Sequence, residues 1–287
     1  MKNLIKISVI TTVYNAETYL RQAVESAIDL EEVGEVILVE DKSPDNALAL
    51  CRELEKEYEK VRVFQHPNGE NRGAGASRNL GIKKSTCDFI AFLDADDFYL
   101  PNRFKSEQKL FEDPEVDAVY GGSGFYFQDK QARSEDLTSF EQKVDQENLL
   151  YEMLILTGKF HTNTITIRKT LLEKTGVFNA NLKLHQDTHL WLRLAHFGNL
   201  VPGQIDRAVS MRRVHSENRI AGKNAKSRAL FHKANFDSFK NYKNVDKRAM
   251  KILINRYVFK VSKNKPEALR LYLKIFSANP ELLRCYF

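Results

Sequence analysis

Three aspartates follow directly on an apolar segment of the chain. Residues 89–93, FIAFL, can form a buried strand, and Asp94, Asp96 and Asp97 come immediately after it. Two carboxylates with one residue between them at the end of a strand can offer oxygen ligands on one side, which suits Mg²⁺ or Mn²⁺ better than zinc. Acids in a loop are also common as turn residues or as helix N-caps. The three aspartates alone therefore fit either a metal site or an ordinary turn.

Apolar runs that alternate with helical patterns indicate how these acids are positioned. Four short runs, ISVITTV, VILVE, VRVFQ and FIAFL, are separated by segments with helical spacing at residues 17–28, at residues 43–60 and in the later part of the glycine-rich stretch NGENRGAGASRNLGI. Strands that alternate with helices are typical of βαβ units with right-handed crossovers. We therefore predict an α/β fold with a mostly parallel central sheet flanked by helices.

The carboxyl ends of the predicted strands define where a ligand should bind, because open parallel sheets bind ligands beyond these ends. The polar residues that follow the four runs should meet there: Thr11 and Tyr14 after the first, Asp41 after the second, Arg72 and Arg78 after the third, and the three aspartates after the fourth. This predicted convergence favours a metal site over an ordinary turn.

The second half of the chain supplies a further acid. A polar stretch at residues 128–146 indicates a surface loop, a helix is expected at residues 147–156, and FHTNTITIRKTLLEKTGVFN predicts a strand, a helix and a turn. The segment LKLHQDTHLWLRLAHFG predicts another helix, with Asp187 in its first turn. A carboxylate at that position lies in the favourable potential of the helix dipole and stays ionised. It can act as a base or only as a helix cap.

The composition indicates an ordinary globular protein with a sizeable core. Of the 287 residues, 43% are hydrophobic and 10% aromatic. No apolar run approaches the roughly 18–20 residues of a membrane-spanning helix, and residues 1–6 do not resemble a signal peptide, so we expect a cytoplasmic protein. Cys51, Cys87 and Cys285 are scattered without CxxC spacing, which indicates neither a disulfide framework nor a zinc site.

The net charge of +6 conceals two parts of opposite sign. Residues 212–287 contain 19 Lys and Arg against 5 Asp and Glu, a net +14, whereas residues 1–211 contain 25 against 33, a net −8. A basic tail of this kind can contact an anionic membrane, an acidic partner or nucleic acid, or can be the solvated face of terminal helices.

Amphipathic spacing narrows these alternatives for the tail. RAMKILINRYVFKV and EALRLYLKIF alternate basic and apolar residues at helical spacing, as in helices that bury one face on the body or rest on an anionic bilayer. No recognisable nucleic-acid-binding module is present, so we expect no nucleic-acid partner. The expected location is the cytoplasm, with peripheral contact to the inner face of the cytoplasmic membrane.

Four segments resemble, in order and spacing, the motifs of one enzyme family. ISVITTVYNAETYLRQAVESAI, VILVEDKSPDNA, GAGASRNLGI and FIAFLDADDF look like the successive signatures of the GT-A fold glycosyltransferases, specifically of family 2, the inverting nucleotide-sugar transferases. The resemblance covers residues 5–216. It implies a GT-A, Rossmann-like domain at residues 1–216, followed by a basic helical C-terminal extension at residues 217–287.

The resemblance also implies roles for individual residues. Thr11, Tyr14 and Asp41 match positions that hold the base and ribose, Arg78 matches a basic residue near the diphosphate, Asp94 and Asp96 match the DxD pair, and Asp187 matches the catalytic base. Asp96 is then the direct metal ligand, and Asp94 lies nearer the ribose or the water shell of the metal. After the second strand relatives often have two aspartates, where this chain has Glu40 and Asp41. Ahead of the apolar helix relatives have an ED pair, where this chain has Gln186 and Asp187, so the first acid is absent.

Two histidines complete the expected site. In many relatives a segment like AVSMRRVHSENRI closes over the donor diphosphate, which makes His215 a candidate metal ligand and Arg212 or Arg213 candidates for a phosphate contact. Alternatively, this segment binds no ligand and is only a basic strand that leads into the C-terminal tail. His161 is a candidate for acceptor contact, although a single histidine is more often structural.

These expectations combine into an inverting transferase that depends on Mn²⁺ or Mg²⁺. Its donor is a nucleotide sugar, UDP-linked in our expectation because Asp41 can accept from an imide N–H, and its acceptor is a hydroxyl of a glycan or a lipid-linked sugar in surface polysaccharide synthesis. The alternative is a non-catalytic, membrane-associated or scaffold protein of the same fold, which would not need Asp96 and Asp187.

Two other nucleotide-binding classes fit the sequence poorly. Gly73, Gly75 and Gly81 do not form GxGxxG, and they follow the third apolar run instead of the first, where a dinucleotide fold carries that motif. A sugar-phosphate nucleotidyltransferase would have a glycine-rich, basic stretch after the first strand, where this chain has TTVYNAET.

Overall fold

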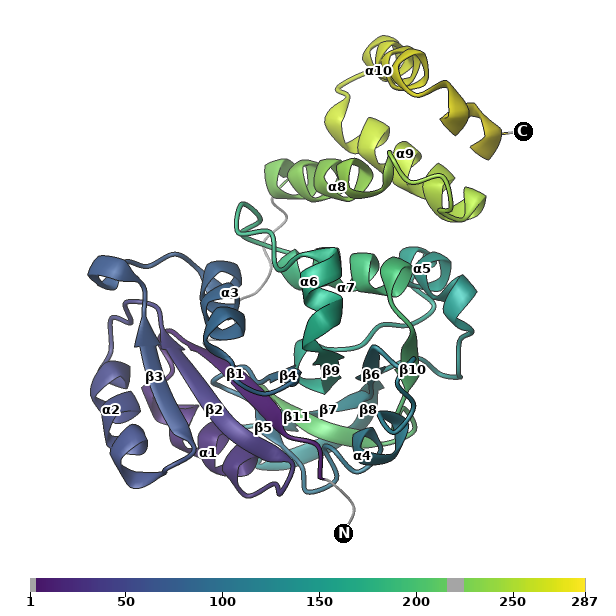
Figure 1. The fold of residues 1–287 in the computed structure, drawn as a ribbon. Helices are drawn as coiled ribbons and strands as arrows, with labels where there is room; N and C mark the ends of the chain where they lie inside the picture. Colours follow the sequence, from purple (N-terminus) through teal and green to yellow (C-terminus); the bar gives the residue numbers. More distant parts are fainter. Residues whose placement is uncertain (1–3, 216–224, 287) are drawn as a thin grey trace.

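A seven-stranded sheet forms the centre of the molecule (Figure 1). The computed structural model describes residues 4–215 and 225–286. The strand order is β10-β6-β9-β4-β1-β2-β3, with bounds β1 (Ile7–Val13), β2 (Val33–Glu40), β3 (Val61–Gln65), β4 (Phe89–Phe92), β6 (Ala118–Tyr120), β9 (Ile165–Arg168) and β10 (Leu200–Pro202). All pairs are parallel except those that β9 makes with β4 and β6. The predicted mostly parallel sheet is confirmed.

Helices cover both faces of this sheet because its central strands are apolar on both sides. Helices α1 (Glu17–Ile28) and α2 (Ala47–Glu57) pack on one face, and α3 (Ala74–Lys84), α5 (Gln146–Ile155), α6 (Lys169–Thr175) and α7 (Gln186–Phe197) lie on the other (Figure 1). Successive strand residues point to opposite faces, so Val9 belongs to the core under α1, whereas Ile10 belongs to the core under α3. This burial fixes the strand register.

Helix α3 lies unusually close to the sheet. A Cβ atom added at Gly81 would lie 2.4 Å from Cγ2 of Ile10 on β1, so a glycine is needed for this approach. Helix α3 packs on β1 and β2, and this packing holds Arg78 within ion-pair distance of Asp94, which follows β4.

A second sheet crosses the lower part of the molecule. Its order is β5-β11-β7-β8, with β5 (Phe98–Tyr99), β7 (Gly122–Phe127), β8 (Ala132–Thr138) and β11 (Ala208–Val214); a short helix α4 (Glu107–Leu110) lies nearby. The predicted loop at residues 128–146 is wrong in part, because β8 forms a hairpin with β7, in which Tyr126 pairs with Arg133. The sequence of β8 is polar because this edge strand is largely exposed, so it lacks the alternation that marks a half-buried strand.

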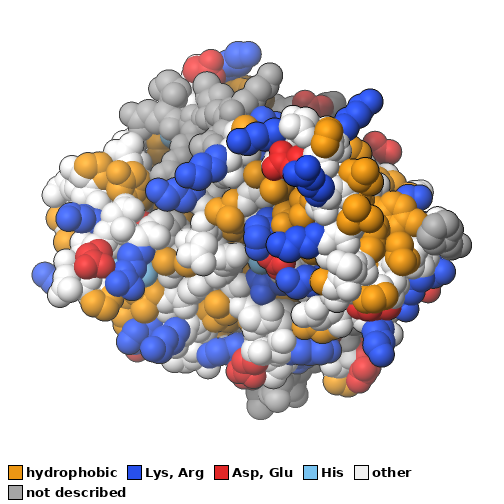
Figure 2. Space-filling view, turned by 90° about the horizontal axis from the view of Figure 1, so that it is seen from above, with side chains coloured by type: hydrophobic (Ala, Val, Ile, Leu, Met, Phe, Trp, Pro, Cys, Tyr) orange, Lys and Arg blue, Asp and Glu red, His pale blue; other side chains and the backbone are white. Residues whose placement is uncertain are grey.

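The C-terminal extension forms a further helical layer over α5 and α7 (Figure 1). It contains α8 (Ala225–Phe239), α9 (Lys247–Val261), α10 (Lys265–Ala278) and a 3₁₀ segment, η3 (Pro280–Cys285). Phe236, Phe239 and Ile254 join the same core as Leu190 of α7. The outer face carries many Lys and Arg side chains beside apolar ones (Figure 2).

The predicted domain boundary at residue 216 lies outside the described residues. Within residues 4–215 and 225–286, no helix combines the length and the apolar character needed to cross a membrane.

Candidate active site

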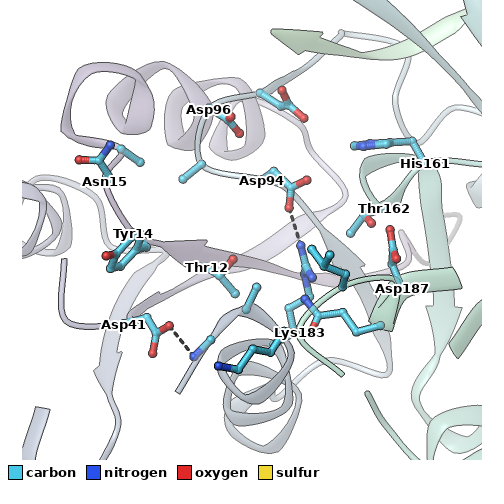
Figure 3. Close-up of a pocket in the computed structure, with 18 of the residues that line it drawn as sticks. Thr12, Tyr14, Asn15, Asp41, Asp94, Asp96, His161, Thr162, Lys183 and Asp187 are labelled. Atoms are coloured by element: carbon cyan, nitrogen blue, oxygen red, sulfur yellow. Dashed lines mark hydrogen bonds and ion pairs between the residues drawn. The ribbon is translucent and has the colours of Figure 1, made fainter. Parts of the chain in front are cut away.

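A pocket of about 500 Å³ lies at the carboxyl edge of the central sheet (Figure 3). Its walls come from the ends of β1, β2 and β4, the start of α3, the turn before β9, the loop into α7 and the end of β11. It brings together eight of the expected residues: Tyr14, Asp41, Arg78, Asp94, Asp96, His161, Asp187 and His215. Tyr14 and Asp41 lie on one side of the pocket, and His161 and Asp187 lie on the opposite side (Figure 3).

Three expected residues, Arg72, Arg213 and Thr11, do not line this pocket. Arg72 is exposed, and its guanidinium pairs with the carboxylate of Glu70. Thr11 lies within β1. It is 0% exposed and lies on the face of β1 that also buries Val9 and Val13. Since strand side chains alternate between faces, the next residue, Thr12, lines the pocket instead. The motif contains two adjacent threonines and does not specify the register of β1, so only the structure shows that Thr12 is the one that lines the pocket.

Asp41 holds the glycine-rich turn that precedes α3. Its two carboxylate oxygens accept the backbone N–H groups of Arg72, at 2.7 Å, and Gly73, at 2.8 Å. The side chain of Asn71 donates to the carbonyl oxygen of Asp41 at 2.7 Å. Gly73 has a φ of +82°, a conformation that glycine adopts without strain. Asp41 is thus a structural anchor of the turn and also part of the pocket wall.

Arg78 and Asp94 form an ion pair at the floor of the pocket, with 2.7 Å between Nη2 and Oδ1 (Figure 3). Burial raises the pKa of Asp94, but the positive charge of Arg78 opposes this and, with smaller contributions from His161 and Arg212, the net effect is a pKa below the ordinary value. Asp94 is therefore ionised at neutral pH. The guanidinium of Arg78 also lies 5.5 Å from the ring centre of Phe178, which helps to fix its position.

Asp96 and His215 meet at the rim of the pocket. Nε2 of His215 lies 3.3 Å from Oδ2 of Asp96, and the imidazole packs 4.8 Å from the ring of Tyr19. The Asp96 side chain remains 36% exposed, so its carboxylate is accessible to a ligand. A carboxylate oxygen beside an imidazole nitrogen is a donor set that Mn²⁺ and Mg²⁺ accept.

Asp97 is buried and supports the loop that carries Asp96. Its carboxylate accepts from the side chain of Asn163 at 2.5 Å and from the backbone N–H of Arg213 at 2.8 Å. Burial, together with the charges of Asp94 and Asp96, raises the pKa of Asp97 well above its ordinary value. Asp94, Asp97 and His161 also offer ligand atoms within 4.8 Å of one another. Asp97 is a poor ligand in that group, because it is buried and its raised pKa disfavours the charged form that binds a cation.

The two neighbouring arginines of β11 have different environments. Arg212 is exposed and lines the pocket, whereas Arg213 is buried. The guanidinium of Arg213 donates to the carbonyl oxygen of Asp96 at 2.9 Å and to the side chains of Gln128 and Gln22, and it packs 4.6 Å from the ring centre of Tyr19. Of the two, only Arg212 is placed to contact a phosphate.

Asp187 occupies the first turn of α7 and faces the pocket (Figure 3). Its Oδ1 accepts the N–H of Thr188 at 2.7 Å, while the residue at the N-cap position, His185, makes no side-chain cap. Gln186 packs against α3, since a Cβ atom added at Gly75 would lie 2.4 Å from its Oε1. Asp187 is therefore the acid that this segment presents to the pocket.

His161 lies on the same side of the pocket as Asp187 (Figure 3). Burial lowers the pKa of its imidazole, and the negative charge of Asp94 opposes this only in part. The ring is therefore neutral at neutral pH. Its Nδ1 accepts from the N–H of Asn163 at 3.4 Å, which starts the 3₁₀ turn η2 (Thr162–Thr164).

Several further residues line the pocket although no motif in the sequence indicates them. They are Thr12, Asn15, Asn71, Thr162 and Lys183. Lys183 lies in the loop between α6 and α7 and reaches the pocket from the side of α3 (Figure 3). Its position three residues before Gln186 in a polar segment was the available clue.

Solved structures define the fold class of this arrangement. The chain superposes on a crystal structure of S. aureus TarS 1–349 in complex with UDP-GlcNAc with a TM-score of 0.70 and 18% identity, covering 96% of this chain and 82% of TarS. It also matches the mannosyltransferase PcManGT from Pyrobaculum calidifontis, solved with GDP-Man and Mn²⁺, with a TM-score of 0.60 and 17% identity, covering 95% and 74%. The fold is therefore the GT-A fold of glycosyltransferases.

Relatives in sequence are named as uncharacterised glycosyltransferases or as minor teichoic acid biosynthesis proteins. An uncharacterised glycosyltransferase of Rickettsia felis is 28% identical over 217 residues, which are 74% of this chain and 34% of that protein. The minor teichoic acid biosynthesis protein GgaA of Bacillus subtilis is 27% identical over 208 residues, 69% of this chain and 46% of GgaA. The chain thus spans less than half the length of both relatives.

The family model for glycosyl transferase family 2 matches residues 8–176, which is more than half of the chain. The protein therefore belongs to glycosyl transferase family 2.

Proposed function

We propose that the protein is an inverting, metal-dependent glycosyltransferase that moves a sugar from a UDP-sugar to a hydroxyl of a glycan or a lipid-linked acceptor. The observation that carries this proposal is the division of one pocket into two walls: the ionised Asp94–Arg78 pair and the Asp96–His215 pair on the side of β4, and Asp187 on α7. The first wall can bind the diphosphate of a donor, and the carboxylate of Asp187 in the second wall can accept a proton from an acceptor hydroxyl.

The donor nucleotide fits the wall formed by the ends of β1 and β2. Tyr14 is 44% exposed and offers an aromatic surface to the base, and the carboxylate of Asp41 can accept from an imide N–H as well as from the turn. This pairing favours uracil over bases without that donor. Arg78 and Arg212 place positive charge beside the diphosphate.

Asp96 and His215 are the residues that would hold a divalent cation. Their atoms already lie within 3.3 Å of each other at an accessible rim, and the second acid, Asp94, is engaged by Arg78. A bound Mn²⁺ or Mg²⁺ supplies positive charge that stabilises the leaving diphosphate. Arg213 and Asp97 keep the loop of Asp96 in place through hydrogen bonds from the guanidinium and the N–H of Arg213.

Asp187 is the proposed general base. It takes the proton from the acceptor hydroxyl while that oxygen attacks the anomeric carbon, and the bond from this carbon to the diphosphate oxygen breaks on the opposite face. A single displacement inverts the anomeric centre. His161 lies in the same wall. Because Nδ1 of its imidazole accepts from the N–H of Asn163, its Nε2–H can donate a hydrogen bond to an acceptor hydroxyl.

The acceptor class rests on the relatives. GgaA is named for minor teichoic acid biosynthesis, which supports a role in a surface polymer. Nucleotide sugars are cytoplasmic metabolites, so the proposed reaction takes place in the cytoplasm. A non-catalytic scaffold of the same fold would not need carboxylates on both pocket walls.

A screen of nucleotide sugars tests the proposal directly. The protein is incubated with each UDP-, GDP- and dTDP-sugar in the presence of Mn²⁺, and release of the nucleoside diphosphate is measured, with the Asp96→Asn variant as the control for contaminating hydrolases. Hydrolysis of a UDP-sugar by the parent alone supports the proposal. Turnover of only GDP- or dTDP-sugars would overturn the UDP assignment, and equal rates in EDTA would overturn the metal requirement.

A further inference from the structure

The outer face of the C-terminal helices exposes three large apolar side chains. Phe259 at the end of α9 is 67% exposed, and Leu269 and Leu273 on α10 are 60% and 63% exposed. The opposite face of α10 is packed, since Ala268 and Ile275 belong to the protein core. Helix α10 is therefore apolar on two sides, although only one side contacts the rest of the molecule.

These side chains form one continuous surface, which we call the α9–α10 face. Leu269 and Leu273 are one turn apart and lie above one another on α10. Tyr272 lies on the neighbouring side of this helix, and its ring centre is 6.4 Å from that of Phe259. Viewed from above, hydrophobic side chains gather at the right of the molecule, over the C-terminal helices (Figure 2).

Basic residues border the α9–α10 face. They are Lys260, Lys263, Lys265, Arg270 and Lys274, all of them exposed. From Lys247 to the end of the chain the sequence contains 10 Lys and Arg but only 2 Asp and Glu, a net +8. One of these acids, Glu267, is engaged at the start of α10, where its carboxylate accepts the N–H of Lys263. The border is therefore strongly positive.

We propose that the α9–α10 face binds the anionic surface of a lipid bilayer, with Phe259, Leu269 and Leu273 inserted between the headgroups. Exposed apolar side chains with a basic border are what an interfacial helix needs, because insertion buries the apolar atoms while Lys and Arg contact anionic lipids. Long basic side chains can keep their charges at the headgroups while their methylene groups follow the apolar surface.

Charge favours a bilayer over the other occupants of such a face. A second copy of this chain would bring together two basic borders, each with five exposed Lys and Arg side chains, and these repel each other. A soluble polyanion would pair with the basic border but would leave the three apolar side chains in water. An anionic bilayer satisfies both parts of the surface.

The fold couples this face to the catalytic domain. Helix α8 packs on α7, whose first turn carries Asp187, and α9 packs on α5. The buried Phe236 and Phe239 of α8 and Ile254 of α9 make this contact part of the main core. A protein bound through the α9–α10 face therefore holds its pocket in a defined orientation to the bilayer, which suits a lipid-linked acceptor.

Vesicle sedimentation tests the proposal without any need for turnover. The full chain is mixed with vesicles of phosphatidylcholine alone, or of equal parts phosphatidylcholine and phosphatidylglycerol, at low and high salt. We expect at least about tenfold stronger binding to the anionic vesicles, lost at high salt. Equal binding to both vesicle types would overturn the proposal.

Paired variants separate the apolar and the basic contribution. Two double variants should each reduce binding to anionic vesicles about tenfold or more. One combines Leu269→Asn with Leu273→Asn, and the other combines Arg270→Gln with Lys274→Gln. The matched controls are Leu4→Asn for the apolar pair and Lys105→Gln with Lys109→Gln for the basic pair; all three positions are exposed and lie far from the C-terminal helices. A control that loses as much binding as its partner variant would overturn the assignment to this face.

Two readouts keep the outcomes distinct. Sedimentation velocity without vesicles reports self-association, and a parent dimer that becomes a monomer in Leu269→Asn with Leu273→Asn, with vesicle binding unchanged, would overturn the proposal in favour of a second copy. UDP-sugar hydrolysis in solution should be unchanged in these variants, because the substituted residues lie outside the pocket. Absence of hydrolysis in the parent would count against the proposed function and not against membrane binding.

Discussion

Nε2 of His215 and Oδ2 of Asp96 lie 3.3 Å apart, although 119 residues separate them in the chain. The contact exists because β11 pairs with β5, with Met211 opposite Phe98, directly after the aspartate loop. If the pair holds a divalent cation, UDP affinity measured by calorimetry with Mn²⁺ should fall at least about tenfold in both Asp96→Asn and His215→Ala. In EDTA the parent should bind UDP as weakly as the variants do.

Asp206→Asn is the matched control for this experiment, since Asp206 is an exposed acid that does not line the pocket. It should bind UDP like the parent. Equal UDP affinity of the parent with Mn²⁺ and with EDTA would show that the pair does not hold a metal that the nucleotide needs.

Arg212 and Arg213 should respond to alanine in opposite ways. Arg213→Ala removes a buried guanidinium with three hydrogen-bonding partners and should lower the free energy of unfolding by about 2–4 kcal/mol. Arg212→Ala should leave stability within about 0.5 kcal/mol but weaken UDP binding about tenfold, because it removes a charge beside the diphosphate. Urea unfolding and calorimetry measure the two effects. A stability loss in Arg212→Ala as large as in Arg213→Ala would contradict this division.

Asp187→Asn separates proton transfer from donor binding. The substitution keeps the size of the side chain but removes its ability to take a proton, so the transfer rate should fall by about 10² to 10⁴. UDP affinity should stay within about threefold, since the donor contacts lie on the other pocket wall. Gln186→Glu, which restores the acid that relatives often carry, should change the rate little. Near-parental transfer by Asp187→Asn would mean that another group is the base.

His189 should make the protein less stable in mild acid. Burial, with a smaller effect of Arg193, lowers the pKa of this imidazole from the ordinary 6.5 to about 4. Between these two pH values the unfolded chain binds a proton that the folded protein does not bind, so the free energy of unfolding decreases as the pH falls. The contribution of neutral His189 to stability is fully present above about pH 6.5. This group should cost about 2 kcal/mol at about pH 5 relative to about pH 7.5.

The variant His189→Gln isolates this contribution. Glutamine can still hydrogen-bond Ser238, which lies 3.2 Å from Nε2 of His189 at the contact of α7 with α8, but it does not titrate. Urea unfolding at both pH values should show a smaller loss in the variant than in the parent. The same loss in both proteins would place the pH dependence elsewhere.

Local patterns in the sequence determined the sheet, its helices and most of the candidate site. The alternation of apolar runs with helical spacing predicted the βαβ order, because burial on both faces of a parallel sheet requires uninterrupted apolar strands. The convergence of Tyr14, Asp41, Arg78 and the aspartates followed from the same order, since the carboxyl ends of parallel strands share one edge. Periodicity also placed Asp187 at the start of a helix.

Only the tertiary structure decided which of several similar neighbours faces the pocket. Thr12 lines it and Thr11 does not, and Arg212 lines it while Arg213 is buried, because strand side chains alternate and the register depends on pairing with distant strands. Lys183 reaches the pocket through a loop whose path is set by the packing of α6 and α7. Contacts of this kind join residues far apart in sequence, and short-range periodicity contains no information about them.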